Sequence, residues 1–162
     1  MCVGIGLDNP KTPKNIGSVM RAAGCYGADL VVQSGRRCRP GSTDTGKQWR
    51  HIPLIQADDL RAMVPYGCVP IAVDLIPGAI CLTDYRHPKR AFYIFGPEDG
   101  TLGRRITSWC KDTIYIPTAY CMNLAATVNV VLYDRMLKKM KCEHIDKKSR
   151  IEELQAVECS AC

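Results

Sequence analysis

Short apolar runs that alternate with helical segments constrain the fold of this chain more than any other feature. The runs predict strands at Val3–Leu7, Leu30–Val32, Val69–Val73, Phe92–Phe95 and Thr113–Ile116. Helical patterns predict helices at Asn15–Tyr26, Ala57–Val64, Leu102–Cys110 and Asn123–Lys141, and Gly27 is placed to stop the first of them. Strands that alternate with helices favour an α/β fold built on a parallel sheet.

Length and composition predict one globular domain in residues 1–141, followed by a charged tail, 142–162, that holds at most one short helix. The chain has 162 residues, of which 46% are hydrophobic and 23% charged, as in soluble globular proteins. It has no apolar run of the ~20 residues that a membrane helix needs. The first residues lack the basic start of a signal peptide. We therefore expect a cytoplasmic protein with reduced cysteines and no membrane partner.

The net charge of +6 lies entirely in one segment. Residues 11–50 hold eight Lys and Arg against two Asp, and the remainder of the chain is balanced. A local basic excess attracts polyphosphate, so the segment is either a solvated loop or a surface for RNA, with DNA not expected. The basic residues we expect to contact RNA are Lys14, Arg36, Arg37, Arg39, Lys47 and Arg50.

Two other motifs imitate known sites. Gly41–Gln48 nearly matches a phosphate-binding loop, but Gln48 replaces the hydroxyl that would hold Mg²⁺, and basic residues precede it where a buried strand is required. Cys159–Cys162 forms a Cys-x-x-Cys motif near Cys142 and His144, although the Cys-x-His spacing is not standard for zinc. We predict no metal site, and a nucleotide-binding enzyme that uses Gly41–Lys47 stays as an alternative.

Three segments carry a family resemblance in their order and spacing: Asn15–Arg21, Phe95–Gly100 and Asn123–Met136. Together they resemble the three motifs of the SpoU/TrmH group of SPOUT RNA methyltransferases, over the chain from Leu7 to about Met140. The resemblance implies transfer of a methyl group from S-adenosylmethionine to a ribose 2′-hydroxyl of tRNA or rRNA. It also implies a SPOUT-type α/β domain with a C-terminal trefoil knot, and a homodimer. A knotted RNA-binding module without catalytic activity is the main alternative.

The resemblance places the cofactor between the turn that follows Phe92–Phe95 and the loop before Asn123. It implies that Gly96, Ile116 and Cys121 line the cofactor pocket, and Val73 is expected to join them. Plain core packing is the alternative for Val73 and Ile116. Cys121 stands where the family usually has serine, and a thiol is a weak hydrogen-bond donor. A substrate contact through that side chain is therefore in doubt.

Four polar residues are the candidates for catalysis: Arg21, Asn15, Glu98 and Asn123. An arginine fork at position 21 suits the phosphate beside the target ribose and the charge that develops on the hydroxyl oxygen. The two asparagines are suited to holding loops or the ribose, and Glu98 to orienting Arg21 or the second asparagine. The alternatives are a helix cap for Asn15 and a helix-dipole partner for Glu98.

Overall fold

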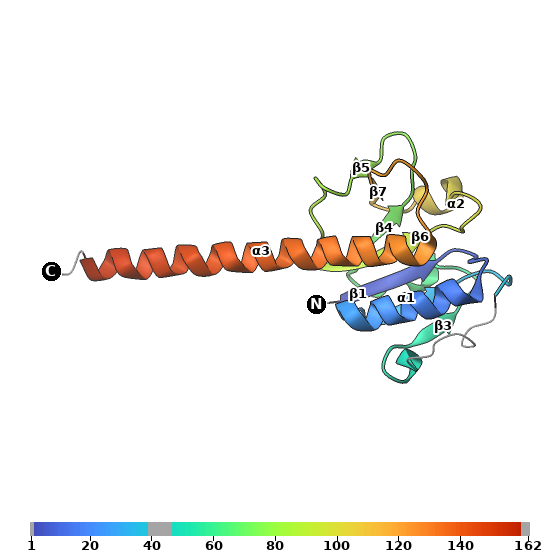
Figure 1. Ribbon diagram of the computed structural model, residues 1–162, viewed down its shortest axis with the longest axis horizontal. Helices are drawn as coiled ribbons and strands as arrows, with labels where there is room; N and C mark the ends of the chain where they lie inside the picture. Colours follow the sequence, from blue (N-terminus) through green and yellow to red (C-terminus); the bar gives the residue numbers. More distant parts are fainter. Residues whose placement is uncertain (1, 39–46, 160–162) are drawn as a thin grey trace.

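A single parallel sheet forms the centre of the protein (Figure 1). The computed structural model describes residues 2–38 and 47–159, with side chains up to residue 141. Seven strands pair in parallel in the order β3-β2-β1-β6-β4-β7-β5. The strands are β1 (Cys2–Leu7), β2 (Leu30–Gln33), β3 (Leu54–Gln56), β4 (Val69–Val73), β5 (Ile80–Cys81), β6 (Arg90–Phe95) and β7 (Asp112–Tyr115). The prediction of an α/β fold with a parallel sheet is confirmed.

Both faces of the sheet are covered, as parallel sheets require. Helices α1 (Pro13–Tyr26) and α3 (Leu124–Cys159) pack side by side on one face (Figure 1). The short helix α2 (Gly103–Thr107) and the 3₁₀ turn η2 (Arg61–Met63) belong to the other face. Side chains of β6 alternate between the two cores, with Tyr93 and Phe95 in one and Phe92 and Ile94 in the other.

Helix α1 begins and ends at residues suited to those places. Pro13 occupies the start of the helix, where its missing N–H costs nothing. Gly27 closes the helix in the left-handed conformation, with φ of 66°, and donates its N–H to the Ala23 carbonyl. The predicted stop at Gly27 is therefore confirmed. The buried face of the helix includes Ile16 and Met20, which rest on the sheet.

Several element boundaries were predicted wrongly. The helix expected at Ala57–Val64 is reduced to the single turn η2, because Val64 must be extended before Pro65. The helix expected over Leu102–Cys110 contains only Gly103–Thr107. Strands β3 and β5, with three and two residues, escaped prediction. The long loop expected up to Arg50 ends in the 3₁₀ turn η1 (Gln48–Arg50).

Helix α3 runs well past the point where we expected it to end. It spans 36 residues and continues from Lys141 to Cys159 without a break. Figure 1 shows its C-terminal half extending away from the sheet. The sequence from 142 to 159 contains no Pro or Gly and is rich in Lys and Glu, which favour helix. None of the described helices has the length and apolarity needed to cross a membrane.

A partly buried polar cluster fixes the first half of α3 to the segment that leads into β6. His87 bonds the Tyr93 hydroxyl at 2.6 Å and the Asp134 carboxylate at 2.8 Å. Arg135 donates to the carbonyl of Pro88 at 2.6 Å. Burial outweighs the Asp134 carboxylate and lowers the pKa of His87. Because α3 is held here, the loop just before it has a fixed place over the sheet.

Candidate active site

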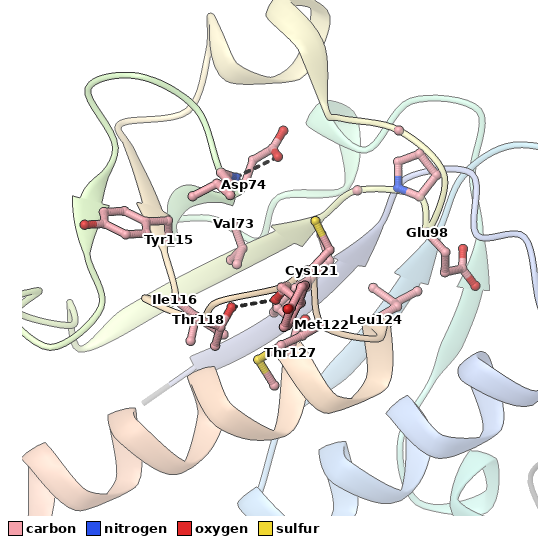
Figure 2. A pocket seen from close by; sticks show the side chains of 16 residues that line it. Val73, Asp74, Glu98, Tyr115, Ile116, Thr118, Cys121, Met122, Leu124 and Thr127 are labelled. Atoms are coloured by element: carbon pink, nitrogen blue, oxygen red, sulfur yellow. Dashed lines mark hydrogen bonds between the residues drawn. The ribbon is translucent and has the colours of Figure 1, made fainter.

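A pocket opens at the carboxyl ends of β4, β6 and β7 (Figure 2). Because these strands are parallel neighbours, the loops that follow them meet at one edge of the sheet, where α/β proteins commonly bind ligands. The pocket has a volume of about 170 Å³. A cavity of about 150 Å³ accommodates a benzene ring, so there is room for a planar ring, and the open side admits a longer ligand.

All four predicted cofactor residues line this one pocket: Val73, Gly96, Ile116 and Cys121. Val73 ends β4, Gly96 follows β6, Ile116 follows β7, and Cys121 lies in the loop before α3. In Figure 2, Val73 and Cys121 flank the same space, and the exposed Cys121 thiol lies near the end of β6. The structure thus brings together residues that are up to 48 positions apart in the sequence.

Further lining residues were not singled out from the sequence. Among the sixteen are Asp74, Leu75, Tyr120, Leu124 and Thr127. Asp74 directly follows a predicted buried strand, and this position was a usable signal, because polar groups at the carboxyl ends of neighbouring strands converge. Tyr120 is 87% exposed, and no sequence pattern distinguishes it from an ordinary loop residue.

The pocket has an acidic rim. Asp74 and Glu98 are both among its lining residues, and no Lys, Arg or His is among the residues described as lining it. Asp74 accepts hydrogen bonds from the backbone N–H groups of Leu75 and Leu102, both at 2.8 Å. In Figure 2, Asp74 and Glu98 lie on either side of Cys121. Such a lining favours a cation and disfavours a polyphosphate.

Glu98 ties the loop after β6 to the loop after β1. Its carboxylate accepts the backbone N–H of Lys11 at 2.7 Å and of Thr12 at 3.1 Å, and the side-chain amide of Asn15 at 2.6 Å. Partial burial would raise the pKa of Glu98, but these hydrogen bonds outweigh it and hold the pKa below its ordinary value. Glu98 is therefore ionised at neutral pH.

Asn15 and Asn123 extend this connection to the start of α3. The Asn123 side-chain amide donates to Asn15 Oδ1 at 3.0 Å, and Asn123 Oδ1 accepts the Ala125 N–H at 2.9 Å. Glu98 therefore orients Asn15, rather than Arg21 or the second asparagine directly. The cap position of α1 belongs to Thr12, so Asn15 is not a helix cap. Three loops far apart in sequence are joined by one chain of side-chain hydrogen bonds.

Arg21 lies away from this chain of hydrogen bonds. It is an exposed residue of α1, six positions after Asn15, which corresponds to about 9 Å along the helix. It is not among the residues described as lining the pocket. The structure therefore places Arg21 on the exposed surface of α1, outside the group formed by Glu98, Asn15 and Asn123.

The predicted RNA-binding residues that the structure describes are Lys14, Arg36, Arg37, Lys47 and Arg50, and all are exposed. Arg37 makes a two-pronged ion pair with Asp99 at 2.7 and 2.8 Å. Lys11 lies 3.6 Å from the same carboxylate, and together the two cations hold the pKa of Asp99 well below its usual range. Arg37 is thus partly neutralised within the protein.

Several predictions concern residues outside the described part of the chain. These are Arg39, most of the Gly41–Gln48 loop, and the side chains of Cys142, His144, Cys159 and Cys162. Within the described residues, no group of His, Cys, Asp and Glu is arranged to hold a metal ion.

Comparison with known proteins gives a consistent match. The profile of the SpoU rRNA Methylase family matches residues 3–133. An uncharacterised tRNA/rRNA methyltransferase of Mycobacterium bovis is 26% identical over 142 residues, and a protein of the same description from Mycobacterium tuberculosis is 25% identical. These alignments cover 79% of this chain but 43% of each relative, so the chain spans less than half the length of these relatives.

Solved structures share the fold. The SpoU methyltransferase AviRb from Streptomyces viridochromogenes, in complex with AdoMet, superposes with a TM-score of 0.74 at 20% identity, over 86% of this chain and 61% of that one. A structure described as giving insight into the 2-OH methylation of C/U34 on tRNA has a TM-score of 0.75 at 24% identity, over 86% of this chain and 97% of that one. A TrmH/SpoU tRNA modifying enzyme of A. aeolicus has a TM-score of 0.76 at 14% identity, over 87% and 77%.

Proposed function

The chain belongs to the SpoU rRNA Methylase family, and on that basis we propose that it is an S-adenosylmethionine-dependent RNA methyltransferase that modifies a ribose 2′-hydroxyl. The observation that carries the proposal is that the described lining of the pocket is acidic and includes no Lys, Arg or His, whereas Lys14, Arg36, Lys47 and Arg50 are exposed outside that lining. A positively charged methyl donor would suit the acidic pocket, and a negatively charged RNA would suit the exposed basic residues.

The pocket suits S-adenosylmethionine in its chemistry. Val73, Ile116 and Leu124 provide apolar wall for an adenine ring. Asp74 and Glu98 provide negative charge for a sulfonium cation. A nucleoside triphosphate would place several negative charges against the same carboxylates, which disfavours ATP as the ligand of this pocket. The alternative of a nucleotide-binding enzyme would use Gly41–Lys47 instead. When bound, the cofactor supplies an electrophilic methyl group.

Three polar residues of the site contribute by holding other parts of the protein in place. Asn15, Glu98 and Asn123 form hydrogen bonds with one another and with backbone N–H groups. They therefore hold the loop after β6 and the start of α3, which both line the pocket, to the start of α1. A bound S-adenosylmethionine would supply the methyl group for the ribose 2′-oxygen, and the segments held by Asn15, Glu98 and Asn123 would keep donor and acceptor in place. Holding the two reactants in line accounts for much of the rate. We therefore assign Asn15, Glu98 and Asn123 as positioning residues.

Arg21 is the candidate for direct contact with RNA. Its guanidinium stays protonated at neutral pH and is a poor base. It is suited to binding the phosphate next to the target ribose and to stabilising the negative charge that develops on the 2′-oxygen. Cys121, which replaces the usual serine, would contribute a weaker hydrogen bond to substrate and leaves backbone contacts to the cofactor intact.

We propose tRNA as the substrate, in the cytoplasm. Support comes from the relative described in terms of 2-OH methylation of C/U34 on tRNA, nearly all of whose length this chain matches. Ribosomal RNA is the other candidate, since the M. bovis relative carries the description tRNA/rRNA methyltransferase. Parallel transfer assays with purified tRNA and with rRNA decide between them.

We further propose that residues 1–141 form the catalytic unit, that its C-terminal part is a trefoil knot, and that two copies share active sites. Tyr133, Met136 and Met140 are exposed on one stripe of α3 and give a second copy an apolar surface. Mixing Arg21→Ala subunits with Asn123→Ala subunits should restore partial activity if sites are shared. No recovery in a verified heterodimer would contradict sharing. Single-molecule stretching tests the knot. A knotted chain, when fully stretched, has a shorter end-to-end length than the contour length of its 162 residues, because the tightened knot retains part of the chain.

Calorimetry with S-adenosylmethionine and with ATP tests the proposal against its alternatives. Cofactor binding accompanied by transfer to RNA supports a methyltransferase. RNA binding without cofactor binding supports the binding module, and ATP binding supports the nucleotide enzyme. Asp74→Asn should weaken cofactor binding, while Asp58→Asn, an exposed carboxylate away from the pocket, should not.

A further inference from the structure

Trp49 is a large aromatic side chain on the protein surface. It lies on η1 and is 52% exposed. The Arg50 guanidinium lies 5.5 Å from the centre of its ring. The other tryptophan, Trp109, is half-buried against the core and donates its indole N–H to the Arg105 carbonyl at 3.0 Å. Core packing therefore accounts for Trp109 but not for the exposed ring of Trp49.

The position of η1 on α1 relates Trp49 to the candidate active site. The Gln48 side chain rests on Gly24, where an added Cβ would lie 2.5 Å from Gln48 Oε1. Gly24 is nine residues after Asn15 on the same helix, which is about 14 Å. A stacked strand advances about 3.4 Å per nucleotide, so roughly four nucleotides cover that length. One strand of RNA is long enough to reach both places.

The surface between these two places is basic. Helix α1 carries Lys14 and Arg21 and has no Asp or Glu in its sequence. Lys47 and Arg50 are exposed on either side of Trp49. A groove or track of cations with an exposed aromatic ring is the combination with which proteins bind single-stranded nucleic acid, because every base offers a face for stacking.

We propose that Trp49 is a stacking platform for an unpaired base of the RNA substrate, within a few nucleotides of the methylated ribose. The inference rests on the proposed function, since the RNA concerned is the one that is methylated. It goes further by requiring that the substrate be single-stranded where it crosses η1. In a duplex the base faces are covered by their neighbours, so a double helix would offer no base face for stacking on Trp49.

Fluorescence of Trp49 tests the stacking directly. Trp109→Phe leaves Trp49 as the sole tryptophan of the chain, and the probes are a ten-nucleotide oligouridylate and a fully paired RNA hairpin of equal charge. Stacking should quench the emission with oligouridylate and much less with the hairpin. The matched variant Trp49→Phe, which keeps Trp109, should show no quenching with either RNA.

Affinity measurements separate stacking from charge. Trp49→Ala should bind oligouridylate about five- to a hundredfold more weakly, by the usual contribution of a stacked base, with an unchanged salt dependence. Trp49→Tyr should recover most of the loss, whereas Lys47→Ala should lower the salt slope. Equal quenching by both RNAs, or wild-type affinity in Trp49→Ala, would overturn the proposal. An emission change that depends on protein concentration without RNA would also overturn it, by placing Trp49 between two copies of the chain.

Transfer of methyl groups to tRNA, measured on the same preparations, keeps this inference distinct from the proposed function. Active enzyme without selective quenching removes the stacking role alone. Selective quenching in a protein that binds no S-adenosylmethionine removes the methyltransferase function alone, and leaves a single-strand-binding protein.

Discussion

Asn123 donates a hydrogen bond to Asn15 at 3.0 Å across 108 residues of sequence, and so fastens the beginning of α3 to the beginning of α1. Through Asn15 the same connection reaches Glu98, on the loop that follows β6. The loop after β6 and the segment that leads into α3 both line the pocket. The shape of the pocket therefore depends on Glu98, Asn15 and Asn123, whose side chains form hydrogen bonds with other residues of the protein.

The first prediction concerns the coupling of the two asparagines. Asn123→Ala removes the hydrogen bond to Asn15 and also the cap on Ala125 N–H, so it should cost about 1–2 kcal/mol of unfolding free energy. Because both residues act through one bond, the double variant with Asn15→Ala should lose less than the sum, by about 0.5 kcal/mol or more. Urea unfolding of the four proteins measures this. If the losses of unfolding free energy in the two single variants add up to the loss in the double variant, the hydrogen bond between the asparagines contributes nothing to stability.

The second prediction concerns pH and Glu98. Its pKa is lowered in the folded protein, so its ionised form stabilises the fold at neutral pH, and this contribution is lost as pH falls through the lowered pKa. Glu98→Gln should therefore reduce stability at pH 7, by about 1 kcal/mol. The gap between variant and wild type should close below the ordinary pKa of about 4.3. A gap that stays constant from pH 7 to pH 3 would show that ionisation of Glu98 is irrelevant; Asp58→Asn serves as the control carboxylate.

The third prediction concerns the salt dependence of RNA binding. Lys47→Ala should lower the slope of log affinity against log salt by about 0.7–0.9, the value of one phosphate contact. Arg37→Ala should lower it less, since Asp99 already pairs with Arg37, and Asp99→Asn should raise it by releasing that cation. Arg61→Ala, on the far face of the sheet, is the control. An equal effect at Arg61 would relocate the RNA surface.

The fourth prediction concerns Arg21. Arg21→Lys keeps the charge but loses the fork that binds phosphate in two places. Cofactor affinity should stay near wild type because Arg21 does not line the pocket. Single-turnover methyl transfer at saturating RNA and cofactor should slow by about 10²-fold or more. A rate within about twofold of wild type would remove Arg21 from the mechanism.

The parallel sheet was predictable because its central strands are buried and apolar. Apolar runs such as Val69–Val73 are easily recognised in the sequence, and their alternation with helical segments indicates the class of fold. Short edge strands carry no such signal. Ile80–Cys81 is a strand only because β7 lies beside it, and the end of η2 depends on Pro65 rather than on any periodicity.

Gly96 and Ile116 were expected at a cofactor pocket from the family resemblance, and the parallel sheet explains why they lie together. Val73 ends β4, and Gly96 and Ile116 directly follow β6 and β7, so the sheet brings the three residues to one edge. The pairing of Arg37 with Asp99, over 62 residues, is a property of three-dimensional packing. No local sequence pattern indicates that a basic residue such as Arg37 forms an ion pair with a distant carboxylate of the same chain.

One measurement tests the central claim most directly. The protein is incubated with tRNA and S-adenosylmethionine that carries an isotopically labelled methyl group, and the RNA is digested to nucleosides for mass spectrometry. We predict that the label appears in a 2′-O-methylated nucleoside and that Asp74→Asn diminishes it, since Asp74 lines the pocket. Label on a base, or no label in any RNA from a protein that binds the cofactor, would contradict the account.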